Sequence, residues 1–236
     1  MGSRIPWPSS DWAPGTFLGG LTPSAAADLL SRCARRRYPT GQAILREGAQ
    51  GSHVVVLESG FVKVTTAVEG QETLLGIRLP GELLGEIGAL TGSPRSATVT
   101  ACGTVHVGVL ARAGFEDFLS CHPGASTLVM ATIAGQLSWA NRRRSDFAAF
   151  PAHVRLARLL VEIAQVCGRP RADDSIEIAV PLSQPELAAM IAIARATVQK
   201  ALHELRARKL ISTAYRRIVI LDPRGLAALT DPDDQR

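Results

Sequence analysis

The sequence predicts an α+β protein with two domains: an N-terminal β jelly roll that ends in a long helix, and a C-terminal winged helix-turn-helix. Three observations lead to this fold class. Short β-branched runs broken by glycine fill residues 38–110, a helical pattern follows from Arg112 to about Asp146, and a helix-start signal precedes two short amphipathic segments nearer the C-terminus. A chain of 236 residues, 46% hydrophobic and 20% charged, is long enough for two such domains.

The first residues indicate where the protein works. The stretch MGSRIPWPSSDWAPG is polar and proline-rich and lacks the apolar core of a signal peptide. No apolar run approaches the roughly 20 residues needed to cross a bilayer. We therefore expect a cytoplasmic protein with no membrane partner. Short helices are expected from about Phe17 to Ser31, with Thr22 as a cap.

Residues 38–110 carry the strands. The runs QAILREG, SHVVVLESG, FVKVTTAVEG, ETLLGIRLPG, RSATVTACG and TVHVGVL are separated by turn signals roughly every eight to twelve residues, which is typical of a compact antiparallel barrel or jelly roll. A jelly-roll metalloenzyme is a remote alternative, because it needs His and carboxylate ligands clustered on neighbouring strands. This region holds only His53 and His106, far apart in sequence, so we expect neither a metal nor an enzyme.

The cysteines are scattered singly along the chain, at Cys33, Cys102, Cys121 and Cys167. They lack the short paired spacing of a zinc or iron–sulfur site. We expect ordinary reduced thiols.

The helical region from Arg112 to about Asp146 has one break, near residues 122–124. Along it Val129, Ile133 and Leu137 recur every four residues and form an apolar stripe. Such a stripe packs either on the helix's own barrel or on a second copy of the chain. Because the stripe continues into Asn141, and an Asn in such a seam can fix register, we expect a homodimer.

Phe150-Pro151 is expected to end the long helix, and HVRLARLLVEIAQVCG to form the next one, followed by RPRADD as a loop. We therefore place the domain boundary between Asp146 and Pro151. The first domain spans residues 17–148 and the second residues 149–227.

The second domain holds the positive charge. The whole chain carries a net charge of +5, whereas residues 194–217 contain seven basic residues against one acid. The rest of the chain is thus close to neutral, and a polyanionic partner should meet the C-terminal module.

Ser183-Gln184-Pro185-Glu186 reads as a capping box at a helix start, and residues 192–194 as a tight turn before a second helix over residues 195–206. That second helix would expose four residues at its N-terminal end, where basic and amide side chains suit base edges in the DNA major groove: Arg195, Ala196, Gln199 and Lys200. LISTAYRRIVIL predicts a hairpin whose Arg216 and Arg217 suit phosphate. The alternative is a solvated charged helix beside a surface hairpin.

The stretch PLSQPELAAMIAIARATVQKALHELRARKLI resembles the winged helix-turn-helix of the cyclic-AMP receptor protein (Crp/Fnr) family of bacterial regulators. Arg195, Thr197, Val198 and Lys200 match the family pattern, and the resemblance implies that Ser183 also belongs to the DNA-binding surface. Ala196 stands where the family usually has a Glu that contacts cytosine, so the usual operator sequence does not carry over. Ala residues also replace the usual turn glycine, at 192, and the usual hydroxyl cap, at 194.

The stretch GEIGALTGSPRSATV is similar to the cyclic-nucleotide phosphate-binding cassette of the same family. The resemblance implies a site at Gly85, Glu86, Ile87, Arg95 and Ser96. There Arg95, Ser96 and helix-start amides would bind the cyclic phosphate, and Glu86 the ribose hydroxyl. The alternative is a barrel turn held by an internal Glu86–Arg95 ion pair, with no ligand.

The family contacts the purine from its long helix, and the matching positions here are Ala140 and Asn141. Asn can both donate to and accept from a base, whereas Ala cannot. Cyclic AMP is the expected effector; cyclic GMP, another nucleotide or no ligand remain open.

Together these features predict a homodimeric, sequence-specific transcriptional regulator that binds a palindromic site on double-stranded DNA under cyclic-nucleotide control. RNA polymerase is a partner if the protein activates. The alternative is a regulator of the same fold that ignores nucleotide and is constitutive or senses another ligand or a redox signal.

Overall fold

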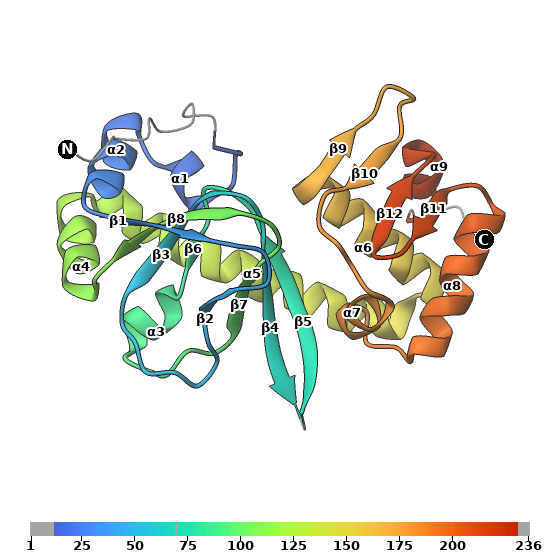
Figure 1. The fold of residues 1–236 in the computed structure, drawn as a ribbon, viewed down its shortest axis with the longest axis horizontal. Helices are drawn as coiled ribbons and strands as arrows, with labels where there is room; N and C mark the ends of the chain where they lie inside the picture. Colours follow the sequence, from blue (N-terminus) through green and yellow to red (C-terminus); the bar gives the residue numbers. More distant parts are fainter. Residues whose placement is uncertain (1–11, 69, 231–236) are drawn as a thin grey trace.

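The computed structural model describes residues 12–68 and 70–230. Most of the N-terminal stretch examined above for a signal peptide lies outside these residues. Figure 1 shows two lobes, a β-rich N-terminal one and a largely helical C-terminal one, with the long helix α5 running behind the first toward the second. Within the described part, no helix combines the length and apolarity needed to cross a membrane.

The N-terminal lobe is the expected jelly roll, made of two four-stranded antiparallel sheets with strand orders β1-β8-β3-β6 and β2-β7-β4-β5. Its strands are β1 Ala34–Tyr38, β2 Ala43–Leu45, β3 Val54–Ser59, β4 Val62–Val68, β5 Gln71–Arg78, β6 Leu83–Leu84, β7 Thr98–Ala101 and β8 Val105–Leu110. Residues such as Leu57, Val99 and Val107 fill the space between the sheets. Burial of this apolar layer is the main driving force for the fold of the lobe.

Helices cover the outer side of the first sheet. They are α1 Phe17–Gly20, α2 Pro23–Ser31, α3 Glu86–Thr91, α4 Arg112–Cys121 and α5 Pro123–Ala149. The expected cap is confirmed, because the Thr22 side chain accepts a hydrogen bond from the backbone of Ala25 at the start of α2. Phe17, Phe115 and Phe118 are fully buried between these helices and the sheet.

The apolar stripe of α5 divides into two faces. Val129 is buried against its own jelly roll and Ile133 packs beside it. Met130 and Leu137, in contrast, are each 62% exposed. The two interpretations of the stripe therefore apply to different residues, and the second face is the one that a partner could cover.

The C-terminal lobe begins after the break at Phe150-Pro151. Its elements are α6 Ala152–Cys167, β9 Gly168–Pro170, β10 Ile176–Ile178, α7 Gln184–Met190, α8 Arg195–Ala207, β11 Ile211–Ala214, β12 Arg217–Ile220 and α9 Pro223–Ala228. The expected hairpin is β11–β12, but it is half of a four-stranded sheet of order β11-β12-β10-β9. The expected loop RPRADD is corrected in its first two residues, Arg169 and Pro170, which belong to β9; its other four form the turn of a second hairpin, β9–β10. Strands of three residues are too short to show a period in sequence.

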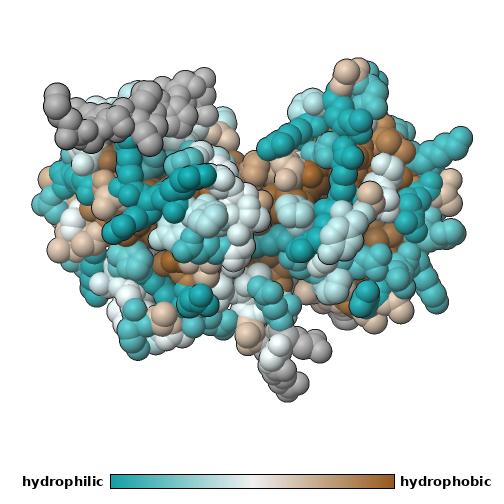
Figure 2. All heavy atoms as spheres, in the orientation of Figure 1, coloured by the Kyte–Doolittle hydropathy of each residue, from teal (hydrophilic) through white to brown (hydrophobic). Residues whose placement is uncertain are grey.

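The two lobes meet across the sheet that contains β4 and β5. Leu74 and Ile77 of β5 are buried in the same apolar cluster as Leu187 and Met190 of α7. Figure 2 shows hydrophobic residues in the recess between the lobes, with hydrophilic surface on either side. The helix-turn-helix is therefore packed directly on the jelly roll.

Candidate functional site

Gly85 directly precedes α3 and has a left-handed backbone, with φ 75° and ψ 9°, which residues with a side chain rarely adopt. Its carbonyl oxygen accepts a hydrogen bond from Nη1 of Arg95 at 2.7 Å. A Cβ atom at position 85 would collide with that same nitrogen. Glycine is therefore required between the start of α3 and the Arg95 guanidinium.

Arg95 is only 4% exposed. Its second terminal nitrogen, Nη2, donates to the backbone carbonyl of His53 at 2.6 Å. Burial lowers the pKa of the guanidinium, and nearby Glu86 partly offsets this effect. In the described part of the chain, no ion pair joins Arg95 to Glu86; the guanidinium is held by two carbonyl oxygens instead.

Glu86 is 5% exposed, in the first turn of α3. Burial raises the pKa of its carboxyl, and its own backbone N–H, Arg78 and Arg95 oppose that rise only in part. Of the other residues expected at this site, Ile87 is 38% exposed and Ser96 is exposed as well. The segment of residues 85–97, called the cassette below, thus buries both charged groups without direct contact between them.

Two adjoining cavities open over the cassette. The smaller, about 70 Å³, is lined by both Glu86 and Arg95. The larger, about 660 Å³, lies between the β4–β5 hairpin, α5 and the end of α7, and its volume is within the range of roughly 300–1,000 Å³ typical of small-molecule sites. The residues that line both are Val64, Arg78, Ser96, Ala97 and Gln136. Cassette and helix α5 therefore enclose one continuous space.

The structure places Asn141 apart from this space. Ala140 lines the larger cavity, whereas Asn141 is exposed on α5 and is not among the residues that line either cavity within one chain. Sequence reasoning missed Gln136, which lines both. It lies one helical turn before Ala140 on the same face of α5, so the four-residue spacing carried the signal.

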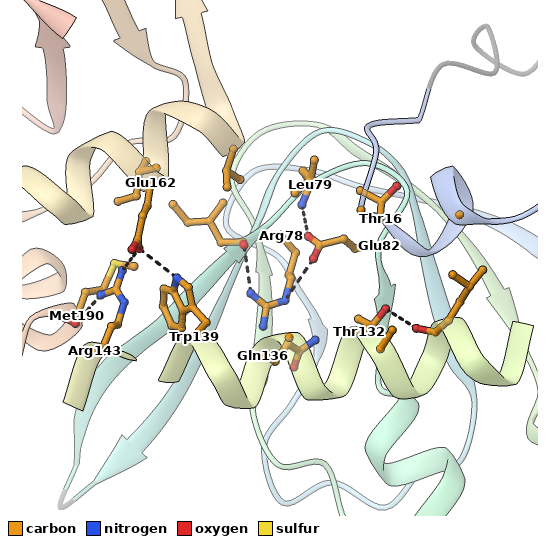
Figure 3. Close-up of a pocket in the computed structure, with 18 residues that line it drawn as sticks. Thr16, Arg78, Leu79, Glu82, Thr132, Gln136, Trp139, Arg143, Glu162 and Met190 are labelled. Atoms are coloured by element: carbon orange, nitrogen blue, oxygen red, sulfur yellow. Dashed lines mark hydrogen bonds and ion pairs between the residues drawn. The ribbon is translucent and has the colours of Figure 1, made fainter. Parts of the chain in front are cut away.

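A third cavity, of about 470 Å³, lies on the neighbouring face of α5, where the helix passes α6 (Figure 3). At its end Trp139 Nε1 donates to Glu162 Oε2 at 3.1 Å, and Arg143 stacks over the Trp139 ring at 3.8 Å. Arg143 Nη1 also donates to the backbone carbonyl of Met190, the last residue of α7. Helix α5 is thus tied to both α6 and α7.

The expected DNA-reading residues lie together at the start of α8. Arg195, Ala196, Gln199 and Lys200 are exposed, Thr197 is half-buried, and the helix is anchored by buried apolar residues on its other face. Residue 194 makes no side-chain cap, as expected for Ala. Ala192 in the turn has φ 50°, a left-handed conformation that costs a residue with a Cβ about 1 kcal/mol.

Ser183 forms the predicted capping box. Its hydroxyl accepts from the backbone N–H of Glu186, whose Oε2 accepts from the backbone N–H of Ser183 at 2.7 Å. In the hairpin β11–β12, Tyr215 and Arg216 form the turn and are exposed. Arg217 differs from Arg216, because it donates two hydrogen bonds to Glu177, at 2.6 and 2.9 Å.

All four cysteines are free, and Cys121 is exposed. Burial raises the pKa of Cys33 to about 12 and that of Cys102 to about 11, which disfavours the reactive thiolate at these two positions. Within residues 12–68 and 70–230 no group of three or more His, Cys, Asp or Glu side chains is placed to hold a metal ion.

Known proteins share both domains and their order. Residues 35–122 match the cyclic nucleotide-binding domain family, and residues 154–229 match the Crp-like helix-turn-helix domain family. A CRP-like cAMP-activated global transcriptional regulator of Mycobacterium tuberculosis is 27% identical over 209 residues, which cover 88% of this chain and 93% of that protein. A cyclic AMP receptor protein of Thermus thermophilus is 28% identical over 187 residues, covering 79% and 83%.

A solved structure shows the same arrangement. The crystal structure of a CRP-family transcriptional regulator from Thermus thermophilus matches with a TM-score of 0.69 at 27% identity, covering 83% of this chain and 96% of that one. Regulators of this kind bind DNA as dimers. The chain is therefore a DNA-binding transcriptional regulator, not an enzyme, and belongs to the CRP/FNR family with a cyclic nucleotide-binding domain and a Crp-like helix-turn-helix domain.

Proposed function

We propose that this protein is a cytoplasmic, homodimeric regulator whose affinity for a palindromic DNA site is set by a cyclic nucleotide bound at the cassette, with cyclic AMP as the effector. The observation that supports it most is the pair Glu86 and Arg95, which are both buried, face one cavity and do not neutralise each other by contact. A buried carboxylate at this position destabilises the folded protein, and such destabilising groups are common in ligand sites.

The residues fit the chemical groups of a cyclic nucleotide. The singly charged cyclic phosphate suits Arg95, already fixed by two carbonyl oxygens, together with the exposed Ser96. Glu86 supplies an acceptor for the ribose hydroxyl, and the absence of a Cβ at Gly85 keeps the Arg95 guanidinium in place. An internal ion pair, the ligand-free alternative, receives no support from these contacts.

The base would extend into the larger cavity beside α5. There the polar residues that also line the smaller cavity are Gln136, Arg78 and Ser96. Cyclic AMP is preferred because the similar proteins of M. tuberculosis and T. thermophilus are described as cAMP-activated and as a cyclic AMP receptor. Asn141 stays a candidate for base contact only through a second chain, since it is exposed on α5.

The proposed dimer uses the second face of α5. Met130, Leu137 and Asn141 lie along that face, seven and four residues apart, and the first two are largely exposed. A two-fold axis between two such helices would place two copies of α8 about one DNA helical turn apart. An activating role would add RNA polymerase as a partner.

The test is the DNA affinity of the protein with and without nucleotide. A fluorescent duplex selected from a random-sequence pool by the purified protein is titrated, and its anisotropy is followed with no nucleotide, with cyclic AMP or with cyclic GMP. We expect cyclic AMP to tighten binding by about tenfold or more. Equal affinity in all three conditions would instead favour a regulator that does not respond to cyclic nucleotide.

A further inference from the structure

The β4–β5 hairpin lies between the smaller cavity over the cassette and the helix-turn-helix, whereas the larger cavity is lined by both the hairpin and the end of α7. Val64 of β4 lines both cavities over the cassette. Its neighbour Lys63 has its side chain on the opposite face, because successive residues of a strand alternate. The register of β4 with β5 shifts between Val64 and Thr65. The register pairs Lys63 with Ile77 and Thr65 with Leu74, and Ile77 and Leu74 pack against the second domain.

Lys63 is a charged residue on the outer face of a sheet, yet only 8% of it is exposed. Its ammonium group donates to the Pro181 carbonyl at 2.5 Å and to Glu186 Oε1 at 2.5 Å. Both partners belong to the second domain. Glu186 is the capping-box residue of α7, and its other oxygen, Oε2, accepts hydrogen bonds from the backbone N–H and the hydroxyl of Ser183. Lys63 is thus bonded to the start of the first helix of the helix-turn-helix.

The other end of α7 is held from the same side of the molecule. Arg143 of α5 donates to the carbonyl of Met190 and lies 3.4 Å from Glu162 of α6 (Figure 3). Between these two ends, Leu187 of α7 shares an apolar cluster with the β5 residues. The first domain therefore contacts α7 at its start, its middle and its end.

We propose that Lys63 is a positioning residue that holds α7, and with it the recognition helix α8, in the orientation that binds DNA. In this arrangement the N-terminal face of α8 is exposed and unobstructed by the first domain. Lys63 also stands next to Val64, so a ligand pressed against the inner face of the hairpin acts directly on this contact. This second step rests on the proposed function; the positioning role does not.

A lysine at position 63 supports a role in fixing the relative orientation of the two domains, rather than in packing alone. Burying an ammonium group beside a carboxylate is seldom more stabilising than a well-packed apolar pair of similar size. The ion pair does, however, require one relative placement of the two domains, because both charges lose their partner if α7 shifts. An apolar contact would persist if α7 moved along the β4–β5 hairpin, whereas the Lys63–Glu186 ion pair would break.

The experiment compares DNA binding by four full-length variants at fixed salt, using the selected duplex described above. Lys63→Met removes the charge, and Lys63→Arg keeps it. The double variant Lys63→Met/Glu186→Gln removes both charges but leaves a side-chain oxygen for the capping box. Arg112→Met is the matched control, because it removes an Arg–Glu ion pair of 2.7 Å that lies wholly within α4.

We expect both variants that contain Lys63→Met to bind DNA about tenfold more weakly, while Lys63→Arg and Arg112→Met bind within about twofold of the unaltered protein. The slope of affinity against salt should not change, because a buried Lys63 releases no counterion from DNA. Unaltered DNA affinity in the folded double variant would overturn the proposal, and so would a shallower salt slope, which would make Lys63 a direct phosphate contact.

Calorimetry of cyclic AMP on the same proteins separates this inference from the proposed function. If no variant binds nucleotide but Lys63→Met still weakens DNA binding, the effector assignment fails and the positioning role stands. If all variants bind nucleotide and DNA equally well, the effector assignment stands and the positioning role fails.

Discussion

Glu86 and Glu186 each occupy the first turn of a short helix, and the two domains treat them in opposite ways. Burial by itself would raise the pKa of both carboxyls. At Glu186 the hydrogen bonds from Lys63 and Ser183 outweigh burial and hold the pKa below its usual range. At Glu86 the burial effect prevails, and its pKa is raised. Among the described residues Glu186 has an ion-pair partner and Glu86 has none.

The difference distinguishes Glu186, whose charge stabilises the structure, from Glu86, whose charge is available to a ligand. A carboxylate whose oxygens are all engaged stabilises the structure around it, and removing it leaves its partners unsatisfied. A buried carboxylate without a partner destabilises the fold that contains it. Such a group is expected where a bound molecule supplies the missing donor.

The largest expected effect comes from breaking the engaged carboxylate. Glu186→Ala should lower the free energy of unfolding by about 3 kcal/mol, because it leaves the Lys63 ammonium buried without its anion and removes half of the capping box. Denaturant unfolding followed by circular dichroism measures this loss. A decrease below about 0.5 kcal/mol would mean that the Lys63–Glu186 contact contributes as little as a solvent-exposed ion pair.

The opposite sign is expected at the cassette. Glu86→Gln should raise the free energy of unfolding of the ligand-free protein by about 1 kcal/mol, since it removes a charge that burial disfavours. The same change should weaken cyclic AMP binding by about tenfold, because a charged acceptor for the ribose is lost. Destabilisation together with unchanged nucleotide affinity would show that Glu86 is a structural group like Glu186.

The pH dependence of stability sharpens the contrast. The pKa of Glu86 is higher in the folded than in the unfolded protein. In acid the carboxyl is protonated in both states and does not lower the free energy of unfolding. As pH rises above the unfolded-state pKa of about 4.3, Glu86 lowers the free energy of unfolding increasingly, until the folded-state pKa is passed. The stabilising effect of Glu86→Gln should therefore be seen at neutral pH and vanish below about pH 4. Glu186, with a lowered pKa, contributes stability that is lost as pH falls through its folded value. Urea unfolding curves of both variants across this range provide the check.

The hairpin β11–β12, which is the wing of the winged helix-turn-helix, offers the same contrast between two arginines, with the smallest expected effect. Arg217 already donates twice to Glu177, whereas Arg216 is exposed at the hairpin turn. Arg216→Gln should flatten the slope of DNA affinity against salt by about one unit, and Arg217→Gln by less. Neither should change the preferred sequence, in contrast to Arg195→Gln. Equal slopes for the two wing variants would mean that DNA displaces Glu177 from Arg217.

The sequence predicted those features that depend on neighbours along the chain. The capping box at Ser183, the turn before Arg195 and the wing hairpin all follow from residues within one or two turns of each other, and the structure contains each of them. The jelly roll follows from the β-branched runs and the spacing of the turns, and the matching family confirms it.

Features that depend on contacts across the fold could not be read in the same way. The bond between Lys63 and Glu186 joins residues 123 positions apart, and an isolated Lys in a strand gives no sign that a second domain will cover it. For the same reason the sequence does not predict that Arg95 donates to two backbone carbonyl groups instead of forming an ion pair with Glu86. Gln136 could be found from its four-residue spacing to Ala140, but Arg78 of β5 lines the cavities through a contact across the fold that no local pattern indicates.

The central claim is that the cassette binds a nucleotide phosphate, and calorimetric titration of cyclic AMP tests it most directly. The unaltered protein and Arg95→Lys are titrated in parallel, because Lys keeps the positive charge but loses the fork that holds two oxygens at once. We predict saturable binding to the unaltered protein and an affinity about a hundredfold lower for Arg95→Lys. No saturable heat with the unaltered protein, or equal affinity in the two, would contradict the account.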